Sequence, residues 1–227
     1  MRIKSITLPL SIVAFLFASL EIGYSHGKEL IQPAKAPITP VSCLTYDYLD
    51  LDYGITDFDN PILDDGGYRW GINFSKSLGE TFFLTGGYTN AGVDYFSNNQ
   101  YFNAESHRYS LGLGAHFALK ECVDLTIEGG VTHTDNRFRG NNTVLGIDGW
   151  GYYVAPGIRA RKGRFEGFAR AVYFDRESLN NNININTNGW VFQPGFLFHL
   201  TDTLAFKVAA DITDENAAVT FGARIHF

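Results

Sequence analysis

Residues Ala217–Phe227, at the end of the chain, read AAVTFGARIHF and decide the fold class. The odd-numbered positions are all apolar, and the even-numbered positions are small or polar, including Arg224 and His226. Because successive side chains of a β-strand point to opposite faces, this period of two predicts a strand with one apolar and one polar face. A terminal strand frays unless a neighbour pairs with it, so we expect this strand to close a sheet on the first strand of the chain.

The composition also favours sheet over helix. The 227 residues include 24 Gly, 19 Phe, 12 Tyr and 3 Trp, but only one Met and two Cys. Aromatic side chains pack well on pleated surfaces, and glycine tolerates the tight turns and close approaches that sheets need. The net charge is −6 and no basic cluster stands out, so we expect no nucleic-acid partner.

The N-terminus has the three parts of a secretory signal peptide. Arg2 and Lys4 form a positive segment, Ile6–Leu20 is an uncharged and mostly apolar run, and small residues follow up to Gly27. The apolar run is too short for a confident membrane span, although a retained N-terminal anchor is the alternative. The expected organisation is a signal peptide (1–27), a proline-rich periplasmic tail (28–43) and a folded barrel domain (44–227).

The rest of the chain repeats a strand-turn-strand unit. Trp70, Tyr109, Trp150 and Trp190 open similar segments at spacings of 39, 41 and 40 residues. Short turns follow these segments, and long polar connections, expected at 56–67, 90–107, 134–149 and 175–189, separate the units. Ten strands are predicted, each near the about 9–11 residues of a tilted membrane strand: 46–55, 68–75, 81–89, 108–118, 123–133, 150–160, 165–174, 190–199, 204–213 and 217–227.

The two faces of these strands differ in charge. One face is apolar, and the other carries the charged residues Asp50, Asp52, Arg69, Arg108, Asp124, Glu128, Arg159, Glu166, Arg170, Lys207, Asp211 and Arg224. A soluble barrel with an apolar interior would show the same alternation. However, the apolar face is too bulky for the inside of ten strands, and its aromatic residues concentrate at strand ends, as in a membrane girdle. We therefore predict an all-β fold, a ten-stranded antiparallel up-and-down transmembrane β-barrel with the charged face inside.

Glycine and proline give two local expectations. Glycines on the polar face, such as Gly112, Gly114 and Gly195, are expected to make room for long charged side chains inside the barrel. Pro156 and Pro194 lie in the middle of predicted strands, where proline removes a ladder hydrogen bond, so bulges or bends are expected there.

The final strand ending on Phe227, the Gly112-Leu113-Gly114 type of strand and the Leu200–Thr203 turn resemble small Gram-negative outer-membrane β-barrel proteins. The resemblance implies a bacterial outer-membrane location with both termini in the periplasm, surrounded by membrane lipid and lipopolysaccharide. It also implies that Phe227 belongs to the signal that the barrel assembly machinery reads. We expect a monomer. The resemblance indicates architecture and not activity.

Six acids and six fixed bases are predicted inside the barrel, and this balance favours mutual pairing. Ten strands leave little open space once these side chains fill it, whereas porins with water-filled channels have about 16 or more strands. We therefore expect a narrow salt-bridged lumen and a structural or surface-interaction role. A narrow path for ions or small solutes is the alternative.

An outer-membrane protease or lipid-modifying enzyme is a further alternative. His107, His133, Asp135, Asp211 and Asp214 are expected near the extracellular rim, but they form no recognisable catalytic motif. We therefore assign no catalytic residue, no cofactor and no metal site, and expect a protein that is not an enzyme. An acidic first connection could bind a divalent cation, but simple solvation explains it better, because its spacing matches no calcium loop: Asp57, Asp59, Asp64 and Asp65.

The predicted long connections contain aromatic residues among amides. Tyr95, Phe96, Tyr101 and Phe102 lie in the second connection, and Ile183 and Ile185 lie in the fourth. Such residues suit contact with an extracellular protein or glycan, and they equally suit packing across the barrel mouth.

The two cysteines, Cys43 and Cys122, are both expected at the periplasmic end. Export permits a disulfide between them. The first strand and the second short turn nevertheless lie far apart around the wall, and cysteines with Cα atoms more than about 7 Å apart cannot be bridged without movement. The sequence leaves this pairing open.

Overall fold

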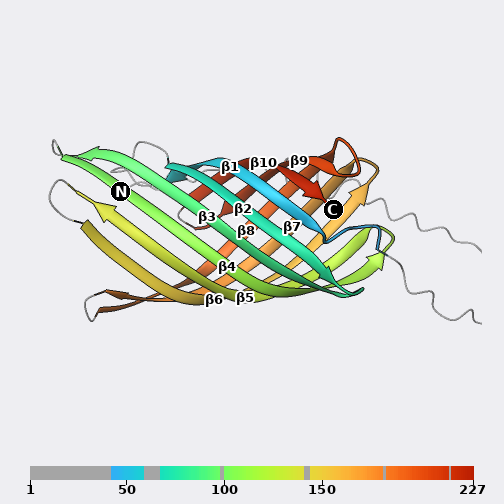
Figure 1. Cartoon of the computed structure of the whole chain (residues 1–227), viewed down its shortest axis with the longest axis horizontal. Helices are drawn as coiled ribbons and strands as arrows, with labels where there is room; N and C mark the ends of the chain where they lie inside the picture. The colour runs from blue at the N-terminus through green and yellow to red at the C-terminus, as the bar shows by residue number, and fades with distance from the viewer. Residues whose placement is uncertain (1–41, 59–66, 98–99, 141–143, 181–182, 215) are drawn as a thin grey trace, which may run out of the picture. The chain divides into compact units, whose positions relative to one another are not determined.

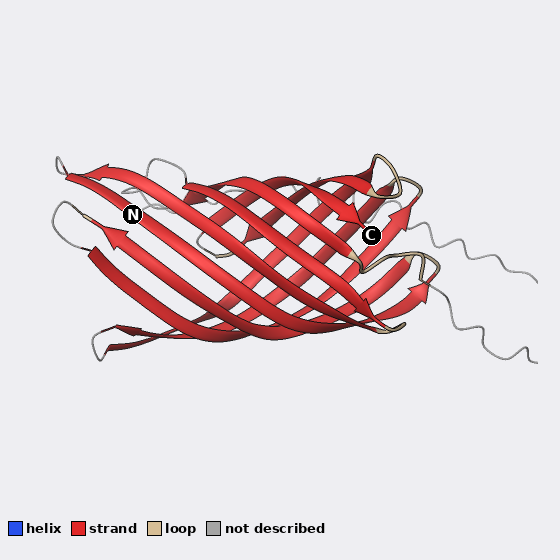
Figure 2. Ribbon diagram, viewed as in Figure 1, coloured by secondary structure: helices blue, strands red, loops and turns tan. Residues whose placement is uncertain are grey.

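The computed structural model describes residues 42–58, 67–97, 100–140, 144–180, 183–214 and 216–227. In these residues ten antiparallel strands form one closed barrel, in which each strand pairs with its neighbours in sequence and β1 pairs with β10 (Figure 1, Figure 2). The predicted ten-stranded antiparallel barrel is confirmed. The strands are β1 (Tyr48–Phe58), β2 (Gly67–Leu78), β3 (Phe82–Ser97), β4 (Gln100–Lys120), β5 (Val123–Arg139), β6 (Val144–Lys162), β7 (Phe165–Asn180), β8 (Ile183–His199), β9 (Leu204–Ile212) and β10 (Asn216–His226).

The described residues include no helix long and apolar enough to cross a membrane. The signal peptide predicted for residues 1–27 lies outside the described residues, as does the expected tail up to residue 41.

The C-terminal strand closes the barrel, as the alternation of its residues predicted. β10 pairs with β1 over its whole length, from Tyr48 opposite His226 to Phe58 opposite Asn216. Its apolar residues, such as Phe221, are exposed on the outside, whereas Arg224 is buried inside.

The two ends of the barrel differ. At one end, which we call the short-turn end, adjacent strands are joined by tight turns, and both Ser42 and Phe227 lie there. At the other end, β3–β4, β5–β6 and β7–β8 extend as three tall hairpins, which project past the ends of β1 and β2 (Figure 1). Strands β3 to β8 have 16 to 21 residues, whereas β1, β2, β9 and β10 have 9 to 12.

The tall hairpins correct the sequence prediction. Most of the long polar connections expected at 90–107, 134–149 and 175–189 are continuous β-ladder. These segments lack an alternating apolar face, so their composition is that of loops. Backbone hydrogen bonds between the strands nevertheless hold them, because a ladder beyond the membrane needs no apolar side chains on either face.

Large apolar side chains cover the outside of the barrel. Toward the hairpin end, aromatic rings form a row across β2 to β6, with centroid separations between neighbouring rings of 5.1, 5.0, 6.4 and 4.8 Å: Trp70, Tyr88, Tyr109, His133 and Trp150. We call this row the upper girdle. Near the short-turn end, Phe165 contacts Phe196 and Phe198, with centroids 5.6 and 5.2 Å apart. Phe227 is 66% exposed at the same end.

The height of the apolar band matches a membrane. On β4 the exposed apolar side chains run from Tyr109 to Leu119. Ten residue steps at about 3.4 Å each span about 34 Å along the strand. A strand tilt of about 40° reduces this to about 26 Å along the barrel axis, close to the about 25 Å apolar band of outer-membrane barrels. The remaining residues of β4, from Gln100 to Arg108, therefore extend beyond that band.

Three glycines inside the barrel make room for aromatic side chains. A Cβ on Gly114 would lie 2.2 Å from the Phe83 ring, and a Cβ on Gly195 would lie 2.1 Å from the Phe168 ring. Gly112 leaves space for the hydroxyl of Tyr153 in the same way. The expectation that these glycines accommodate charged side chains is therefore wrong for all three.

The two mid-strand prolines interrupt the ladder without shifting it. Pairing between β6 and β7 is absent at Ala155 and Pro156, and pairing between β8 and β9 is absent at Gln193 and Pro194. The register is the same on both sides of each gap, so neither proline produces the expected bulge. In the described ladders a register shift occurs instead between Ala118 and Lys120, where β4 meets β5.

Candidate functional site in the barrel lumen

The charged face predicted from the sequence lines the lumen, and most of its members pair with one another. Asp50 is the centre of the group at the short-turn end. Its two carboxylate oxygens accept hydrogen bonds from Nε and Nη2 of Arg224, at 2.7 and 2.8 Å. Lys207 Nζ donates to Asp50 at 2.7 Å and to Asp52 at 2.9 Å. Asp50 is 2% exposed, so these contacts compensate a carboxylate removed from water.

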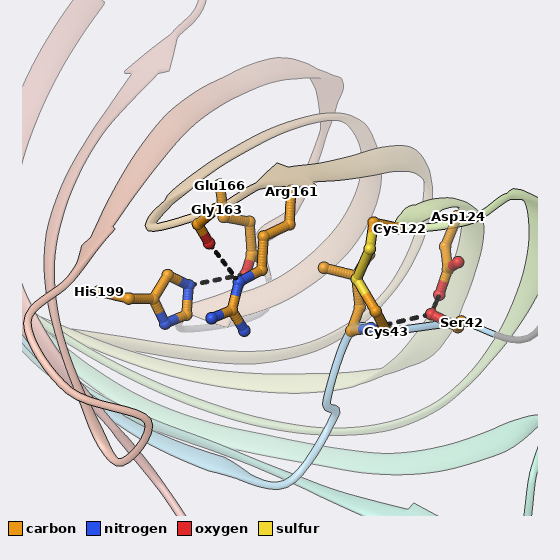
Figure 3. Close-up of a disulfide and its surroundings, with 9 residues drawn as sticks. Ser42, Cys43, Cys122, Asp124, Arg161, Gly163, Glu166 and His199 are labelled. Carbon is orange, nitrogen blue, oxygen red and sulfur yellow. Dashed lines mark hydrogen bonds and ion pairs between the residues drawn. A yellow bond between two sulfur atoms is a disulfide. The ribbon is translucent and has the colours of Figure 1, made fainter.

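Glu166 of β7 is the centre of a second buried group. Arg159 donates to Glu166 Oε1 from Nε and Nη2, at 2.9 and 2.7 Å. His199 Nε2 lies 3.2 Å from the other oxygen of Glu166, as Figure 3 shows. Arg224 Nη1 lies 3.9 Å from Glu166 Oε1, so the two groups are joined.

Residues Ser42–Asp47, which we call the closing segment, cross the barrel from β1 toward β5. Cys43 forms a disulfide with Cys122 of the β4–β5 turn, with their Cα atoms 4.8 Å apart (Figure 3). Ser42 Oγ donates to Asp124 Oδ2 at 2.7 Å, and Arg159 Nη1 donates to the Thr45 carbonyl at 3.1 Å. The separation between the first strand and this turn does not prevent the bridge, because the closing segment spans it.

The turn that carries Cys122 adopts an unusual backbone conformation for a cysteine. Cys122 has a φ of 60°, and glycine occupies the positive-φ position in two other short turns, at Gly79 and Gly163. A side chain in this left-handed region costs about 1–2 kcal/mol relative to the right-handed one. The disulfide gives a structural reason for a cysteine at this position.

Tyr46 fills the short-turn end of the lumen. It is 3% exposed, and its ring stacks on Phe83 and His116 with centroids 4.7 and 4.2 Å apart. The Arg159 guanidinium lies 4.5 Å from the centre of the ring. Burial raises the pKa of the Tyr46 hydroxyl, so the group stays protonated and donates to Asp124 Oδ2 at 3.0 Å. Asp124 therefore pairs with the closing segment and His116, not with a fixed base.

A third group of polar side chains occupies the middle of the lumen. Glu128 accepts hydrogen bonds from Tyr153 at 2.7 Å and from Arg170 at 3.2 Å. Gln193 accepts from Arg170 Nε at 2.6 Å and donates to Asp211 at 2.7 Å. Arg69 pairs with the other oxygen of Asp211. Ten of the twelve predicted lumen charges thus pair with one another, and the exceptions are Asp124 and Arg108.

Arg108 and Arg176 lie in the part of the lumen nearest the hairpin end. Neither side chain forms an ion pair or hydrogen bond with any other described residue, and Arg176 Nε is buried without a partner. Sequence reasoning missed Arg176 because it fell in the predicted connection 175–189. Its even number places it on the same face of β7 as Glu166 and Arg170, and this parity could have found it.

A cavity of about 230 Å³ runs through these groups, from Tyr46 at the closed end to Arg108 and Arg176. Sequence reasoning also missed Tyr46, Tyr153 and Gln193, which line the same space. Tyr46 begins the predicted first strand, 46–55, but it is uncharged, and in the structure it lies before β1. Tyr153 and Gln193 are uncharged, so a count of charges omits them.

Two of the candidate catalytic residues, His107 and Asp135, lie opposite each other in the β4–β5 ladder, but their side chains have other partners. His107 Nδ1 lies 2.8 Å from the Tyr88 hydroxyl, and Asp135 pairs with Arg137 at 2.8 Å. His133 stacks within the upper girdle and lies 4.0 Å from a carboxylate oxygen of Asp148. In the described ranges, no three His, Cys, Asp or Glu side chains are placed to hold a metal ion.

Several predicted surface residues lie outside the described residues or have undescribed side chains. Asp59, Asp64 and Asp65 of the acidic first connection are among them, as is the side chain of Asp57. The same holds for the side chains of Tyr95, Phe96, Tyr101, Ile183 and Ile185.

Comparison with known proteins gives structural similarities alone. No protein-family model and no curated protein matches the sequence. The translocator domain of the autotransporter NalP from Neisseria meningitidis is similar, with 9% identity, a TM-score of 0.48, and coverage of 96% of this chain and 95% of that chain. The outer membrane protein OprG from Pseudomonas aeruginosa has 12% identity and a TM-score of 0.42, over 80% and 95% of the two chains.

Ail, the attachment invasion locus protein of Yersinia pestis, has 12% identity and a TM-score of 0.37, over 81% of this chain and all of that chain. At these identities and TM-scores the similarities carry no functional assignment.

Proposed function

We propose that this chain is a bacterial outer-membrane β-barrel protein with a closed, salt-bridged lumen that acts through its outer surface. The observation that carries the proposal is the exposed apolar band bounded by aromatic side chains, with the charges inside. In water, this continuous band would far exceed the apolar patches of a few hundred Å² that soluble monomers expose. In a membrane, the same band is buried in hydrocarbon and the girdles lie at the interfaces.

The short-turn end faces the periplasm in this proposal, and lipopolysaccharide surrounds the outer part of the band. The tall hairpins then project from the cell surface by the length of strand that the membrane does not require. Surface interaction is favoured over transport because the closing segment and Tyr46 fill one end of the lumen. The partner is an extracellular protein or glycan, the chain acts as a monomer, and no catalytic step is assigned to it.

The orientation can be tested by labelling single cysteines in intact cells. The chain has two cysteines, and both are in the disulfide, so a new thiol is the only reactive one. Asp148→Cys, on the tall β5–β6 hairpin at a side chain that is 73% exposed, should react with a membrane-impermeant maleimide. The matched variant Asp202→Cys, in the exposed β8–β9 turn, should react only after the outer membrane is permeabilised. The reverse pattern would contradict the proposed orientation.

The surface role can be tested by shortening two of the tall hairpins, β5–β6 and β3–β4, without disturbing the barrel. Asp135 pairs with Asp148, so residues 136–147 can be replaced by an Asn-Gly turn that continues the ladder. Val93 and Ala104 allow the same replacement of residues 94–103. The shortened proteins should keep heat-modifiable migration on gels but lose adhesion of cells to matrix proteins or glycans, or phage adsorption. Unchanged adhesion and phage adsorption for every shortened hairpin would reduce the role to a structural one.

The absence of catalysis is itself testable. Proteoliposomes of the purified protein should show no turnover of peptide or lipopolysaccharide substrates. Turnover that disappears in His107→Ala or His133→Ala would contradict the proposal and favour an outer-membrane enzyme.

A further inference from the structure

The charges that line the central cavity do not balance. Seven Arg and Lys side chains line it, but only three carboxylates do: Asp50, Glu128 and Asp211. Two further acids, Asp52 and Glu166, do not line the cavity, but each pairs with a base that does. Five acids therefore face seven bases, in a protein whose net charge is −6. The cavity concentrates positive charge that the rest of the chain does not carry.

Arg108 and Arg176 account for this excess of positive charge. Each of the other five bases has an acidic partner: Arg224 and Lys207 pair with Asp50, Arg159 with Glu166, Arg170 with Glu128, and Arg69 with Asp211. Arg108 and Arg176 have none among the described residues. Arg176 and Arg69 repel Arg108 across the lumen, and the attraction from Asp211 is shared, because Asp211 already pairs with Arg69 and Gln193. An anion from solution would offset the excess positive charge of these two side chains.

Hydroxyl groups lie beside both arginines. Thr89 is the ladder partner of Arg108, and residues opposite each other in a ladder place their side chains on the same face. On the other wall, Gly151 lies between Arg176 and Thr132 in the two adjoining ladders. A Cβ on Gly151 would lie 2.5 Å from the Asp175 carbonyl oxygen and 3.1 Å from both the Arg176 Cα and the Thr132 hydroxyl, so only glycine lets these two strands approach so closely here. Thr89 and Thr132 both line the cavity and can donate hydrogen bonds to a bound anion.

We propose that this part of the lumen binds a small phosphate-type dianion, held between Arg108 and Arg176 with Thr89 and Thr132 beside it. Two guanidinium groups supply two positive charges and two planar forks of donors, which match the oxygen atoms of phosphate. The cavity of about 230 Å³ is smaller than the about 300–1,000 Å³ of pockets for drug-sized ligands, so a compact anion fits and a large solute does not. The site does not depend on the surface role of the hairpins.

Calorimetric titration of the full chain, refolded in detergent micelles, tests the site with inorganic phosphate as the probe. Chloride at equal ionic strength is the comparison, and glycerol 3-phosphate separates free phosphate from a phosphate carried on a larger solute. Wild-type protein should bind at least one of the two phosphate probes and show no heat of binding for chloride. Arg108→Gln and Arg176→Gln should each weaken binding by about 10- to 100-fold, the effect expected for losing a charged hydrogen-bonding partner.

Arg137→Gln is the matched control, because Arg137 lies exposed on the outside of the β5–β6 hairpin and pairs with Asp135. Heat-modifiable migration would verify that each variant folds. A second readout separates ligand binding from a structural role: without phosphate, the doubly substituted protein should unfold at the same urea concentration as wild type or higher, since two repelling charges are gone. Phosphate should raise the midpoint of wild type alone. Failure of wild type to bind either phosphate probe, or unchanged phosphate binding in the double variant, would overturn the proposal.

Discussion

The hydroxyl oxygen of Tyr46 lies 3.0 Å from Asp124 Oδ2, although 78 residues separate the two in sequence. This contact joins the segment before the first strand to the strand almost opposite it in the barrel. It places a buried aromatic ring, packed between Phe83 and His116, across one end of the lumen. A residue outside the ten strands therefore blocks this end of the lumen.

Replacing Tyr46 by alanine should open the lumen to small ions. The wild-type protein should give no stable nanosiemens currents in planar bilayers, because ten strands filled with paired side chains leave little free space. Tyr46→Ala removes the ring and should produce small, resolvable current steps. Tyr46→Phe is the matched control: it keeps the ring, loses one hydrogen bond of about 1 kcal/mol, and should stay closed. The absence of current steps with Tyr46→Ala, or large currents from wild type, would contradict this account of the closed end.

Removing the disulfide should destabilise the folded barrel. The bridge between Cys43 and Cys122 closes a loop over a sequence separation of 79 residues. The chain-entropy model gives about 4.5 kcal/mol for a loop of this length, and typical measured effects are about 2–4 kcal/mol. The double variant Cys43→Ser, Cys122→Ser should lower the free energy of unfolding in urea by the latter amount. Reduction of the wild type with dithiothreitol should reproduce the loss, and it should leave the double variant unaffected.

The contacts of Asp47 predict a small loss of stability in acid. Partial burial acts to raise its pKa, but hydrogen bonds from the Ser77 amide at 2.6 Å and Lys76 at 3.0 Å outweigh burial and hold the pKa below its ordinary value of 3.8. Because the folded-state pKa is lowered, the stabilisation is complete above pH 3.8 and is lost as the pH falls through the folded value. In Asp47→Asn the urea midpoint should therefore depend less on pH between pH 5 and about pH 2.5 than it does in wild type. An acid dependence identical to that of wild type would contradict the assignment to Asp47.

Gly195 should not tolerate a side chain. A Cβ at this position would lie 2.1 Å from the Phe168 ring, so Gly195→Ala forces the ring to move inside a filled lumen. We expect a loss of about 1–3 kcal/mol in the free energy of unfolding, as for other overpacked interiors. Gly146→Ala is the matched control, because no atom lies within 4 Å of its added Cβ. In Phe168→Leu the cost of Gly195→Ala should shrink, and additive effects of the two changes would rule out the proposed clash.

Phe227 should matter more for assembly in cells than for stability. Its ring is 66% exposed, and its recorded contact is with Lys76 Nζ, 5.3 Å from the ring centre. Phe227→Ala should therefore change the free energy of unfolding by less than about 1 kcal/mol. If Phe227 is read by the barrel assembly machinery, the variant should fold in detergent like wild type but accumulate less heat-modifiable protein in the outer membrane. Lys76→Ala is the control, and normal accumulation of Phe227→Ala would argue against the assembly signal.

The part of the fold within the apolar band could be predicted from the sequence because each strand there faces two different environments. Glu166 and Phe165 illustrate this, since adjacent residues are 1% and 54% exposed on opposite faces of β7. Beyond the band neither face of a hairpin meets hydrocarbon, so the apolar alternation disappears and residues such as those at 90–107 look like a loop. Apolar periodicity therefore could not predict the length of the tall hairpins.

The site could be predicted in part, for a related reason. Charges within recognisable strands were found by parity, whereas Arg176 lay past the apparent end of its strand and was not counted. Its omission made the lumen look neutral, with six acids and six bases. Tyr46 was missed because it is uncharged, and only the three-dimensional course of the closing segment brings it to Asp124.

The bond between Cys43 and Cys122 also determines how the barrel would respond to mechanical force. A pull on the chain upstream of Cys43 would pass through the two sulfur atoms into the β4–β5 turn, instead of peeling β1 away from β10 and β2. In the reduced protein the same load would fall on the ladder between β1 and β10, one hydrogen-bonded pair at a time. The covalent bridge thus shields the seam of the barrel from tension applied to its N-terminal tail.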